Sequence, residues 1–358
     1  VEVQVYVTDA EQGDVLEYAI QDGDEVVASS EVPADQTVQG FVIENVHLWN
    51  GKKDPHLYTA VVKLKRKQSV LDERTARFGC RTYVIDPENG FILNGKSYPL
   101  RGVARHQDRP KKGNALSRQD HEEDISLILE MGANTIRLAH YQHDQYFYDL
   151  CDEKGLVIWA EIPYISKNMP NGRENTISQM TELITQNYNH PCIVVWGLSN
   201  EITMGGDPDD PDLLENHHIL NDLCHRLDPT RLTTMAVVSM CSMDSAYVQI
   251  PDVLSYNHYY GWYGGTTDMN GEFFDEFHKK YPNRAVGMSE YGCEALNWHT
   301  SNPMQGDYTE EYQAYYHEEL IKQLFTRKFI WATHVWNMFD FAADSRAEGG
   351  ENGMNHKG

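Results

Sequence analysis

The sequence predicts a multidomain α/β protein in which a β-sandwich precedes a (β/α)8 barrel, also called a TIM barrel. The length of 358 residues is more than one small domain needs and suits a large barrel with a smaller module. Short apolar runs separated by turn-rich pieces fill residues 1–84, whereas candidate strands alternate with amphipathic helices over residues 85–358. The change in pattern near residue 85 therefore marks a domain boundary.

The first domain, residues 1–84, is expected to consist of β-strands. Its apolar runs, several of which alternate with polar residues, are interrupted by turn sequences such as DAEQGD and QDGDE. Strands at this spacing are typical of a β-sandwich. The expected strands read VEVQVYV, VLEYAI, EVVASSEV, GFVIENV, LYTAVVKLK and VLDERTARFG.

The second domain, residues 85–358, is expected to form a barrel of eight parallel strands. The candidate strands are apolar throughout, as strands are in a parallel sheet that helices cover. No glycine-rich turn follows the first of them, which argues against an open doubly wound sheet. The expected strands are 99–105, 135–140, 156–162, 193–200, 232–238, 253–257, 285–290 and 330–337, and the expected helices are 118–132, 144–154, 176–189, 212–227, 271–280 and 309–327.

Both ends of the chain suggest a piece of a longer protein. The sequence begins without Met and in the middle of a strand pattern, and it stops after the eighth barrel strand. We therefore expect the last barrel helix to be absent and the outer face of the eighth strand to be uncovered. Trp336 and the tail 345–358 are expected to be loosely held as a result.

The composition disfavours several classes of partner. A formal net charge of −24 argues against nucleic acid and against anionic membrane surfaces. No apolar run approaches the roughly 18–20 residues of a membrane span. The first residues, VEVQVYVTDA, alternate like a strand, so we do not expect them to be a signal peptide. The six cysteines are scattered without a CxxC pair, which favours a reducing compartment and a cytoplasmic location.

Polar, ionisable and aromatic residues follow the predicted barrel strands, at the end where this fold places its chemistry. One such residue at one strand end is usually solvated or ion-paired. Seven strand ends that share this character favour an active site, because each buried polar group costs stability unless it is satisfied. These ends read RHQD (105–108), RLAHY (137–141), Trp159 with Glu161, Asn200–Glu201, NHYY (257–260), SEY (289–291) and Trp336–Asn337.

Two carboxylates stand out because their strands lie across the barrel from each other. Glu201 ends the fourth strand and Glu290 ends the seventh. Paired carboxylates with Trp and Tyr nearby are typical of a glycosidase, in which one acid protonates the leaving oxygen and the other attacks or steers water. The chain has no GxSxG turn and no GxxxxGK[ST] loop, and its strand-end histidines lack metal-like spacing.

The motifs that contain these two glutamates resemble motifs of a known family. GLSNE (197–201) and MSEYG (288–292) resemble the acid/base and nucleophile motifs of glycoside hydrolase family 2, the β-galactosidase and β-glucuronidase family. LWNGKKDPHLY resembles the immunoglobulin-like domain of that family, and FGCRTYVIDPENGFILNGKSYPLRGVARHQD resembles its entry into the barrel. The resemblance covers essentially the whole chain and implies that the β-sandwich is immunoglobulin-like.

The resemblance implies a retaining hydrolysis by double displacement, with Glu201 as general acid/base and Glu290 as nucleophile. The two carboxyl groups should then lie roughly 5–5.5 Å apart. Tyr259 would lie against Glu290, and a cis peptide bond would join Trp336 to Asn337. The residues that the resemblance assigns to substrate binding are His106, Arg137, His140, Asn200, Trp336, Asn355 and Lys357.

The sequence indicates the identity of the sugar in the substrate less clearly. Asn355 and Lys357 in MNHKG match an Asn-x-Lys pattern with which β-glucuronidases bind the substrate carboxylate. The surrounding FDFAADSRAEGGENGMNHKG and EYGCEALNWHTSNPMQGDYTEEYQAYYHE resemble bacterial β-galactosidases more closely. We therefore expect a bacterial β-galactosidase that removes terminal non-reducing β-D-galactose residues, with β-glucuronidase as the alternative.

An inactive carbohydrate-binding scaffold is the alternative from another class, but it would require the loss of Glu201 or Glu290. No cofactor is expected, because IPYISKN (162–168) lacks the acidic and His ligands with which some family members bind magnesium. The expected partner is a β-galactoside or oligosaccharide substrate, with no nucleic acid and no membrane. The full-length enzyme, with the N-terminal jelly-roll domain of the family, could form a homo-oligomer.

Overall fold

The computed structural model describes residues 1–299, 305–346 and 352–358, in two compact units. The first unit comprises Val1–Arg81 together with Asp152–Gly155 and Asn189–Pro191, and the second comprises the other residues from Thr82 onward. The change of unit after Arg81 falls close to the boundary expected after residue 84. Among the described residues, no helix has the length and apolar character that crossing a membrane requires.

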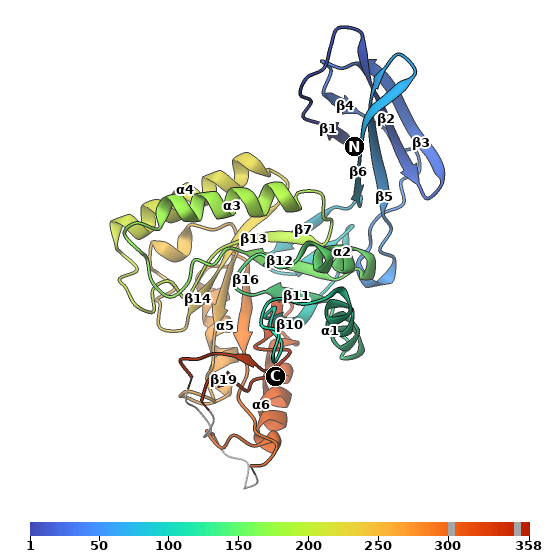
Figure 1. Cartoon of the computed structure of the whole chain (residues 1–358). Helices are drawn as coiled ribbons and strands as arrows, with labels where there is room; N and C mark the ends of the chain where they lie inside the picture. The colour runs from blue at the N-terminus through green and yellow to red at the C-terminus, as the bar shows by residue number, and fades with distance from the viewer. Residues whose placement is uncertain (300–304, 347–351) are drawn as a thin grey trace. The chain divides into compact units, whose positions relative to one another are not determined.

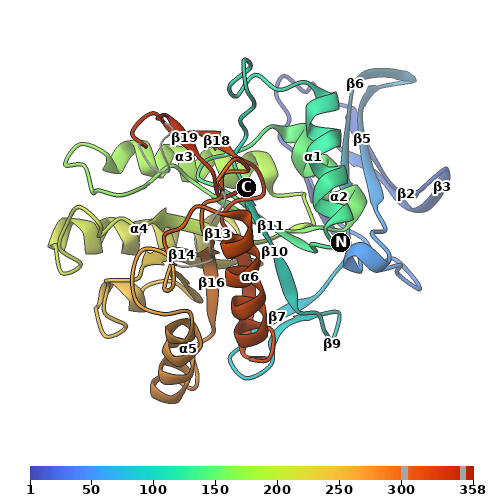
Figure 2. The ribbon, with the colours of Figure 1, turned by 90° about the horizontal axis from the view of Figure 1, so that it is seen from below.

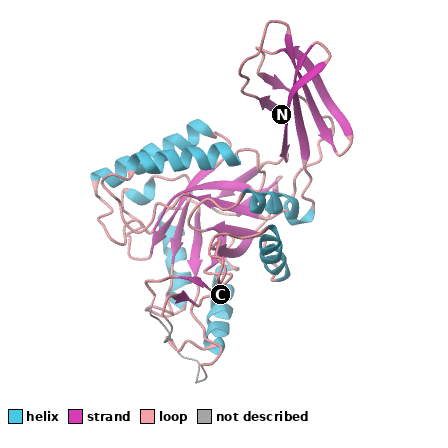
Figure 3. Cartoon of the chain, viewed as in Figure 1, coloured by secondary structure: helices cyan, strands magenta, loops and turns pink. Residues whose placement is uncertain are grey.

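The first unit is built from antiparallel strands (Figure 3). Four strands pair in the order β3-β2-β5-β6, and β1 pairs with β4. Alternate side chains of β2 are buried, and Val3 of β1 packs on the cluster around Leu16 and Tyr18. The strand expected over 40–46 is wrong, because β4 ends at Gly40. The elements are β1 (Glu2–Gln4), β2 (Asp14–Asp22), β3 (Glu25–Pro33), β4 (Val38–Gly40), η1 (Gly51–Lys53), β5 (Tyr58–Arg66) and β6 (Ser69–Phe78).

The second unit is a closed barrel of eight parallel strands, which confirms the predicted fold (Figure 1). The ring closes where Val103 of the first strand pairs with Val335 of the last. A three-stranded sheet, β7 (Tyr83–Asp86), β8 (Gly90–Leu93) and β9 (Lys96–Ser97), precedes it. The barrel strands are β10 (Leu100–Arg105), β11 (Thr135–Leu138), β12 (Val157–Glu161), β13 (Ile193–Asn200), β14 (Leu232–Val238), β15 (Leu254–Asn257), β16 (Val286–Tyr291) and β17 (Ile330–Val335).

Within the described part of the chain, six α-helices lie outside the barrel strands, as the amphipathic segments predicted (Figures 1 and 2). Ser117 and Asp120 form a capping box at the start of the first of them. The connection from β14 to β15 contains the short 3-10 helix η2 (Tyr247–Gln249). The helices are α1 (Arg118–Glu130), α2 (Gln145–Lys154), α3 (Arg173–Asn187), α4 (Pro211–Leu227), α5 (Asp268–Lys280) and α6 (Glu310–Leu324).

The region after β17 differs from what the sequence predicted. A groove of about 610 Å³ is lined by residues of β10 and by Val335 of β17, together with Ile321 of α6 and Phe325, which follows that helix. The expected loose packing is nevertheless wrong for Trp336, which is 5% exposed, and for the described end of the tail, where Lys357 is 1% exposed. The short strands β18 (Phe341–Ala342) and β19 (Met354–Asn355) pair and hold this segment.

Candidate active site

A cavity of about 810 Å³ opens at the carboxyl ends of the barrel strands. Its lining comes from segments that follow β10 to β17, so the barrel brings together residues that are far apart in the sequence. Both Glu201 and Glu290 line it. The residues expected at the site that also line the cavity are His106, His140, Asn200, Tyr259 and Trp336.

Glu290 is held by two donors, one on each carboxylate oxygen. Arg137 Nη1 donates to Oε1 at 2.6 Å, and the Tyr259 hydroxyl donates to Oε2 at 2.7 Å. Because Glu290 is only 4% exposed, these two bonds fix the orientation of its carboxyl group. A carboxylate held in this way is suited to act as a nucleophile.

Arg137 is itself fixed from behind by Glu161. The arginine donates through Nε and Nη2 to the two carboxylate oxygens of Glu161, at 3.0 and 2.9 Å, and both side chains are fully buried. Burial alone would raise the pKa of Glu161, but Arg137 and His140 together lower it. The expected sugar-binding role of Arg137 has no support in its position, because the side chain lies beneath Glu290 and is not part of the cavity lining.

Tyr259 keeps its proton. Burial, followed by the negative charges of Glu290 and Glu201, raises the pKa of its hydroxyl well above the ordinary value. The hydroxyl therefore remains a hydrogen-bond donor to Glu290 at any pH at which the protein would work. This position against Glu290 is the one that the sequence predicted.

Glu201 differs from Glu290 in its surroundings. It follows β13 in the left-handed region, with φ of 47°, which is uncommon for a residue other than glycine and is found at strained functional positions. Burial, and then the charge of Glu290, raise its pKa to about 7. Glu201 can therefore hold a proton near neutral pH and release it, as a general acid/base must.

Two amides connect these carboxyl groups. Arg137 Nη2 and Asn257 Nδ2 both donate to Asn200 Oδ1, at 2.8 and 3.2 Å, and so fix which way the Asn200 amide points. Asn257 Nδ2 also lies 3.1 Å from Glu201 Oε1. The sequence placed Asn257 at a strand end but assigned it no role.

An aromatic cluster forms the floor of the cavity. Trp336 stacks on His140, with ring centroids 4.8 Å apart and planes at 18°, and the edge of His106 meets it at 5.2 Å. Burial, then His140 and Arg137, lower the pKa of His106 to about 3, so its ring is neutral. The expected cis bond between Trp336 and Asn337 is confirmed, and a second, between Ala139 and His140, had no signal in the sequence.

Asn355 and Lys357 do not line the cavity, although both are buried. Lys357 Nζ contacts Glu294 Oε1 at 2.9 Å and the hydroxyl of Tyr263, which lines the cavity, at 2.8 Å. Arg346 lines the cavity, and its Nη1 donates to the same hydroxyl at 2.8 Å. The sequence analysis assigned no role to Tyr263, Glu294 or Arg346, although Glu294 and Arg346 lie inside segments quoted there and Tyr263 follows NHYY (257–260).

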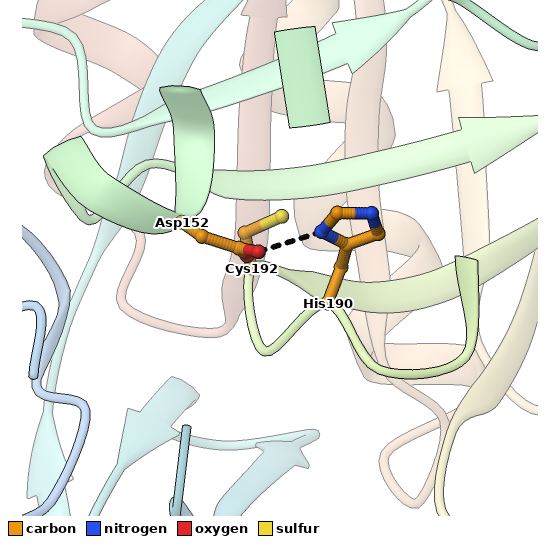
Figure 4. A group of neighbouring side chains, drawn as sticks. All are labelled: Asp152, His190 and Cys192. Atoms are coloured by element: carbon orange, nitrogen blue, oxygen red, sulfur yellow. Dashed lines mark hydrogen bonds and ion pairs between the residues drawn. The ribbon is translucent and has the colours of Figure 1, made fainter. Parts of the chain in front are cut away.

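Among the described residues, three neighbouring side chains form a group of candidate metal ligands. Ligand atoms of Asp152, His190 and Cys192 lie within 4.8 Å of one another (Figure 4). His190 Nδ1 is 2.6 Å from Asp152 Oδ2, a hydrogen-bond distance that is too short for two ligands of one metal ion. We therefore assign no metal to this group.

Comparison with known proteins places both units in one family. The model described as "Glycosyl hydrolases family 2, TIM barrel domain" matches residues 86–355, and the model described as "Glycosyl hydrolases family 2" matches residues 1–81. A beta-glucuronidase of Bacteroides fragilis is 43% identical over 333 residues, which are 89% of this chain and 47% of the relative. The chain spans about half the length of the curated relatives that it matches.

Two solved structures are also similar. An FMN-binding beta-glucuronidase from Facaelibacterium prausnitzii L2-6 is 48% identical with a TM-score of 0.97, and the match covers 100% of this chain and 56% of the other. A protein from Bacteroides fragilis, provisionally named a beta-galactosidase, is 34% identical with a TM-score of 0.91, and the match covers 96% of this chain and 53% of the other.

Proposed function

The chain belongs to glycoside hydrolase family 2, and on that premise we propose that it carries the catalytic site of a retaining β-glucuronidase. The observation that carries the reaction type is the contrast between its two carboxyl groups. Glu290 accepts hydrogen bonds from Arg137 and Tyr259, whereas burial and the charge of Glu290 raise the pKa of Glu201 to about 7. One group is therefore suited to attack and the other to transfer a proton.

In the first step, a Glu290 oxygen attacks the anomeric carbon of the substrate. The bond from that carbon to the glycosidic oxygen breaks, and Glu201 gives its proton to the departing oxygen. Arg137 and Tyr259 hold the attacking carboxylate in place, and Asn200 is oriented toward the sugar by the bonds that its amide oxygen accepts. The product of this step is a glycosyl ester of Glu290.

In the second step, the Glu201 carboxylate takes a proton from a water molecule, and the water oxygen attacks the same carbon. The ester bond breaks and Glu290 is regenerated as a carboxylate. Asn257 donates to Glu201 Oε1, a hydrogen bond that favours the charged form needed at this stage. Carboxyl groups and water suffice for both steps, so we propose a hydrolysis without metal or flavin.

A glucuronide is the substrate that we favour, in place of the galactoside that the sequence suggested. The support for this choice is the charge beside Tyr263. The Tyr263 hydroxyl contacts two cations, Arg346 and Lys357, and Lys357 in turn contacts one carboxylate, Glu294. A net positive wall would attract the carboxylate of a uronic acid, whereas a galactoside carries a neutral hydroxyl group there. The name of the 43% identical relative also supports a glucuronide.

A panel of nitrophenyl β-glycosides would test the proposal. The expected result is that kcat/KM for the β-glucuronide exceeds that for the β-galactoside by at least about tenfold. A preference for the galactoside would overturn the proposed sugar but keep the mechanism. The absence of turnover with every glycoside would favour the inactive carbohydrate-binding scaffold.

A further inference from the structure

Large apolar side chains border the cavity although they are exposed to solvent. Ile165 is 39% exposed, Met204 51% and Met240 76%, and all three line the cavity. Exposed apolar side chains that gather at a concave site, unlike ones scattered singly, indicate a binding surface. We name these three residues the apolar wall.

The apolar wall lies on the same side of the cavity as Glu201. Ile165 forms a bridge with Asn200, which precedes Glu201 in the chain. The Met204 amide donates to the Glu201 carbonyl at 2.9 Å. Met240 follows β14, whose Ala236 carbonyl accepts the Glu201 amide at 2.8 Å. Trp336 and the other floor residues follow β10, β11 and β17, and β17 lies opposite β13 in the ring.

The chemistry of the proposed reaction says what must occupy the Glu201 side. The general acid has to reach the glycosidic oxygen, and the group on the far side of that oxygen is the aglycone. Resting on the function proposed above, we propose that the apolar wall is an aglycone site that takes a flat, uncharged, aromatic leaving group. Methionine suits this role, because its thioether is adaptable and contacts aromatic rings favourably.

The rest of the lining on this side agrees with an apolar occupant. Six of the lining residues on this side are uncharged, namely Ile165, Ser166, Met204, Val238, Ser239 and Met240. The charge of Arg346, which also lines the cavity and acts on Glu201, comes from the segment after β18. A second sugar would instead be recognised through several hydrogen bonds, for which this side offers two serines. An aromatic aglycone would cover the exposed methionine side chains and remove them from water.

The test compares two substrates that share a sugar and differ in the leaving group. One is a naphthyl β-glucuronide, and the other is glucuronyl fluoride, whose leaving group is too small to contact the apolar wall. In the double variant Met204→Ser/Met240→Ser, we expect kcat/KM for the naphthyl substrate to fall by about tenfold or more. The loss on the fluoride should be at least about fivefold smaller.

Two further variants serve as controls. Met240→Leu keeps the apolar surface and should keep the naphthyl activity to within about threefold. Met169→Ser removes a methionine that is 58% exposed and lies outside the cavity lining, so the ratio between the two substrates should stay that of the wild type. Thermal unfolding of each variant would show that the fold is retained.

Equal losses on both substrates, or an unchanged naphthyl activity in the double variant, would overturn the aglycone site. If the proposed sugar is wrong, the wild type should instead cleave the naphthyl β-galactoside and galactosyl fluoride. The same comparison of variants is then made with these two substrates. A wild type that cleaves no glycoside would overturn both the proposed function and this inference.

Discussion

The side-chain amide of Asn257 donates a hydrogen bond to the carboxyl group of Glu201, with 3.1 Å between Nδ2 and Oε1. The amide is oriented by Ser289, whose hydroxyl donates to Asn257 Oδ1 at 2.6 Å. Since Ser289 directly precedes Glu290, the strand that carries the proposed nucleophile also orients the donor that holds the proposed acid/base.

Replacing Asn257 by Ala should move the pH dependence of the enzyme. The Asn257 hydrogen bond lowers the pKa of Glu201 against burial and the charge of Glu290, which raise it to about 7. Without that bond the pKa should rise further, so the alkaline limb of kcat/KM, where Glu201 loses its proton, should shift to higher pH. The charges of Arg137 and Arg346, which also lower the pKa of Glu201, are unchanged in this variant. A pH profile on one aryl glycoside measures the shift.

The Ser289→Ala variant is the matched control for that shift. The variant leaves the Asn257 amide present but removes the hydroxyl that orients it, so we expect a smaller shift in the same direction. A profile that stays unchanged in both variants, or a shift to lower pH in Asn257→Ala, would contradict the assignment of Asn257 to Glu201.

Substitution of the two glutamates should separate their roles. Glu290→Gln removes the attacking carboxylate and should abolish turnover of every substrate. Glu201→Gln should slow substrates with poor leaving groups by roughly 10²–10⁴-fold, but slow activated aryl glycosides much less, because these depart without a proton. A plot of log kcat against leaving-group pKa is the measurement, and a slope that equals that of the wild type would refute the role of Glu201.

The sequence was sufficient to predict the barrel and the position of Glu201 and Glu290 at its cavity, because both depend on local pattern. Strand and helix periods repeat along residues 85–358, and Glu201 and Glu290 end strands whose separation puts them across the ring. The sandwich was predicted less well, since GFVIENV has the composition of a strand, whereas β4 ends at Gly40. Strand pairing at a sheet edge depends on the neighbouring chain, which composition does not reveal.

The positions of the polar side chains behind the cavity could not be predicted in the same way. Arg137 was expected to contact the sugar, but it lies beneath Glu290 because Glu161 binds its guanidinium from the other side. Lys357 was expected to bind the substrate, but it is not part of the cavity lining and is buried against Glu294 and Tyr263. Each outcome depends on a buried partner from a distant segment, and strand-end composition alone does not identify which carboxylate will pair with which cation.

The buried pair of Arg137 and Glu161 gives a prediction on stability. Arg137→Met leaves Glu161 and Glu290 without their buried cation, so the free energy of unfolding should fall by about 3–5 kcal/mol. The double variant Arg137→Met/Glu161→Met removes the unpaired charge at Glu161 and should recover part of that loss. Activity should not recover, because Glu290 still lacks its donor. Urea unfolding with kcat/KM measures both, and a double variant that regains activity would show that Arg137 serves only the fold.

The proposed sugar depends on the cationic wall, and Arg346 is the better residue with which to test it. Lys357 is fully buried and is the nearer of the two cations beside the buried Glu294, so Lys357→Ala would weaken a buried ion pair and confuse lost binding with lost stability. The Arg346 side chain is 33% exposed, lines the cavity and lies 3.7 Å from Glu294 Oε1, a longer contact than that of Lys357, so its removal should cost less stability than removal of Lys357. A charge-assisted hydrogen bond contributes about 1.5–3 kcal/mol, so Arg346→Ala should lower kcat/KM for a β-glucuronide by about 10- to 100-fold. The loss on the matching β-galactoside should stay within about threefold, and Arg346→Lys, which keeps the charge, should restore part of the glucuronide activity. Equal losses on the two glycosides would mean that Arg346 supports the cavity wall through Tyr263 and does not select the uronic acid.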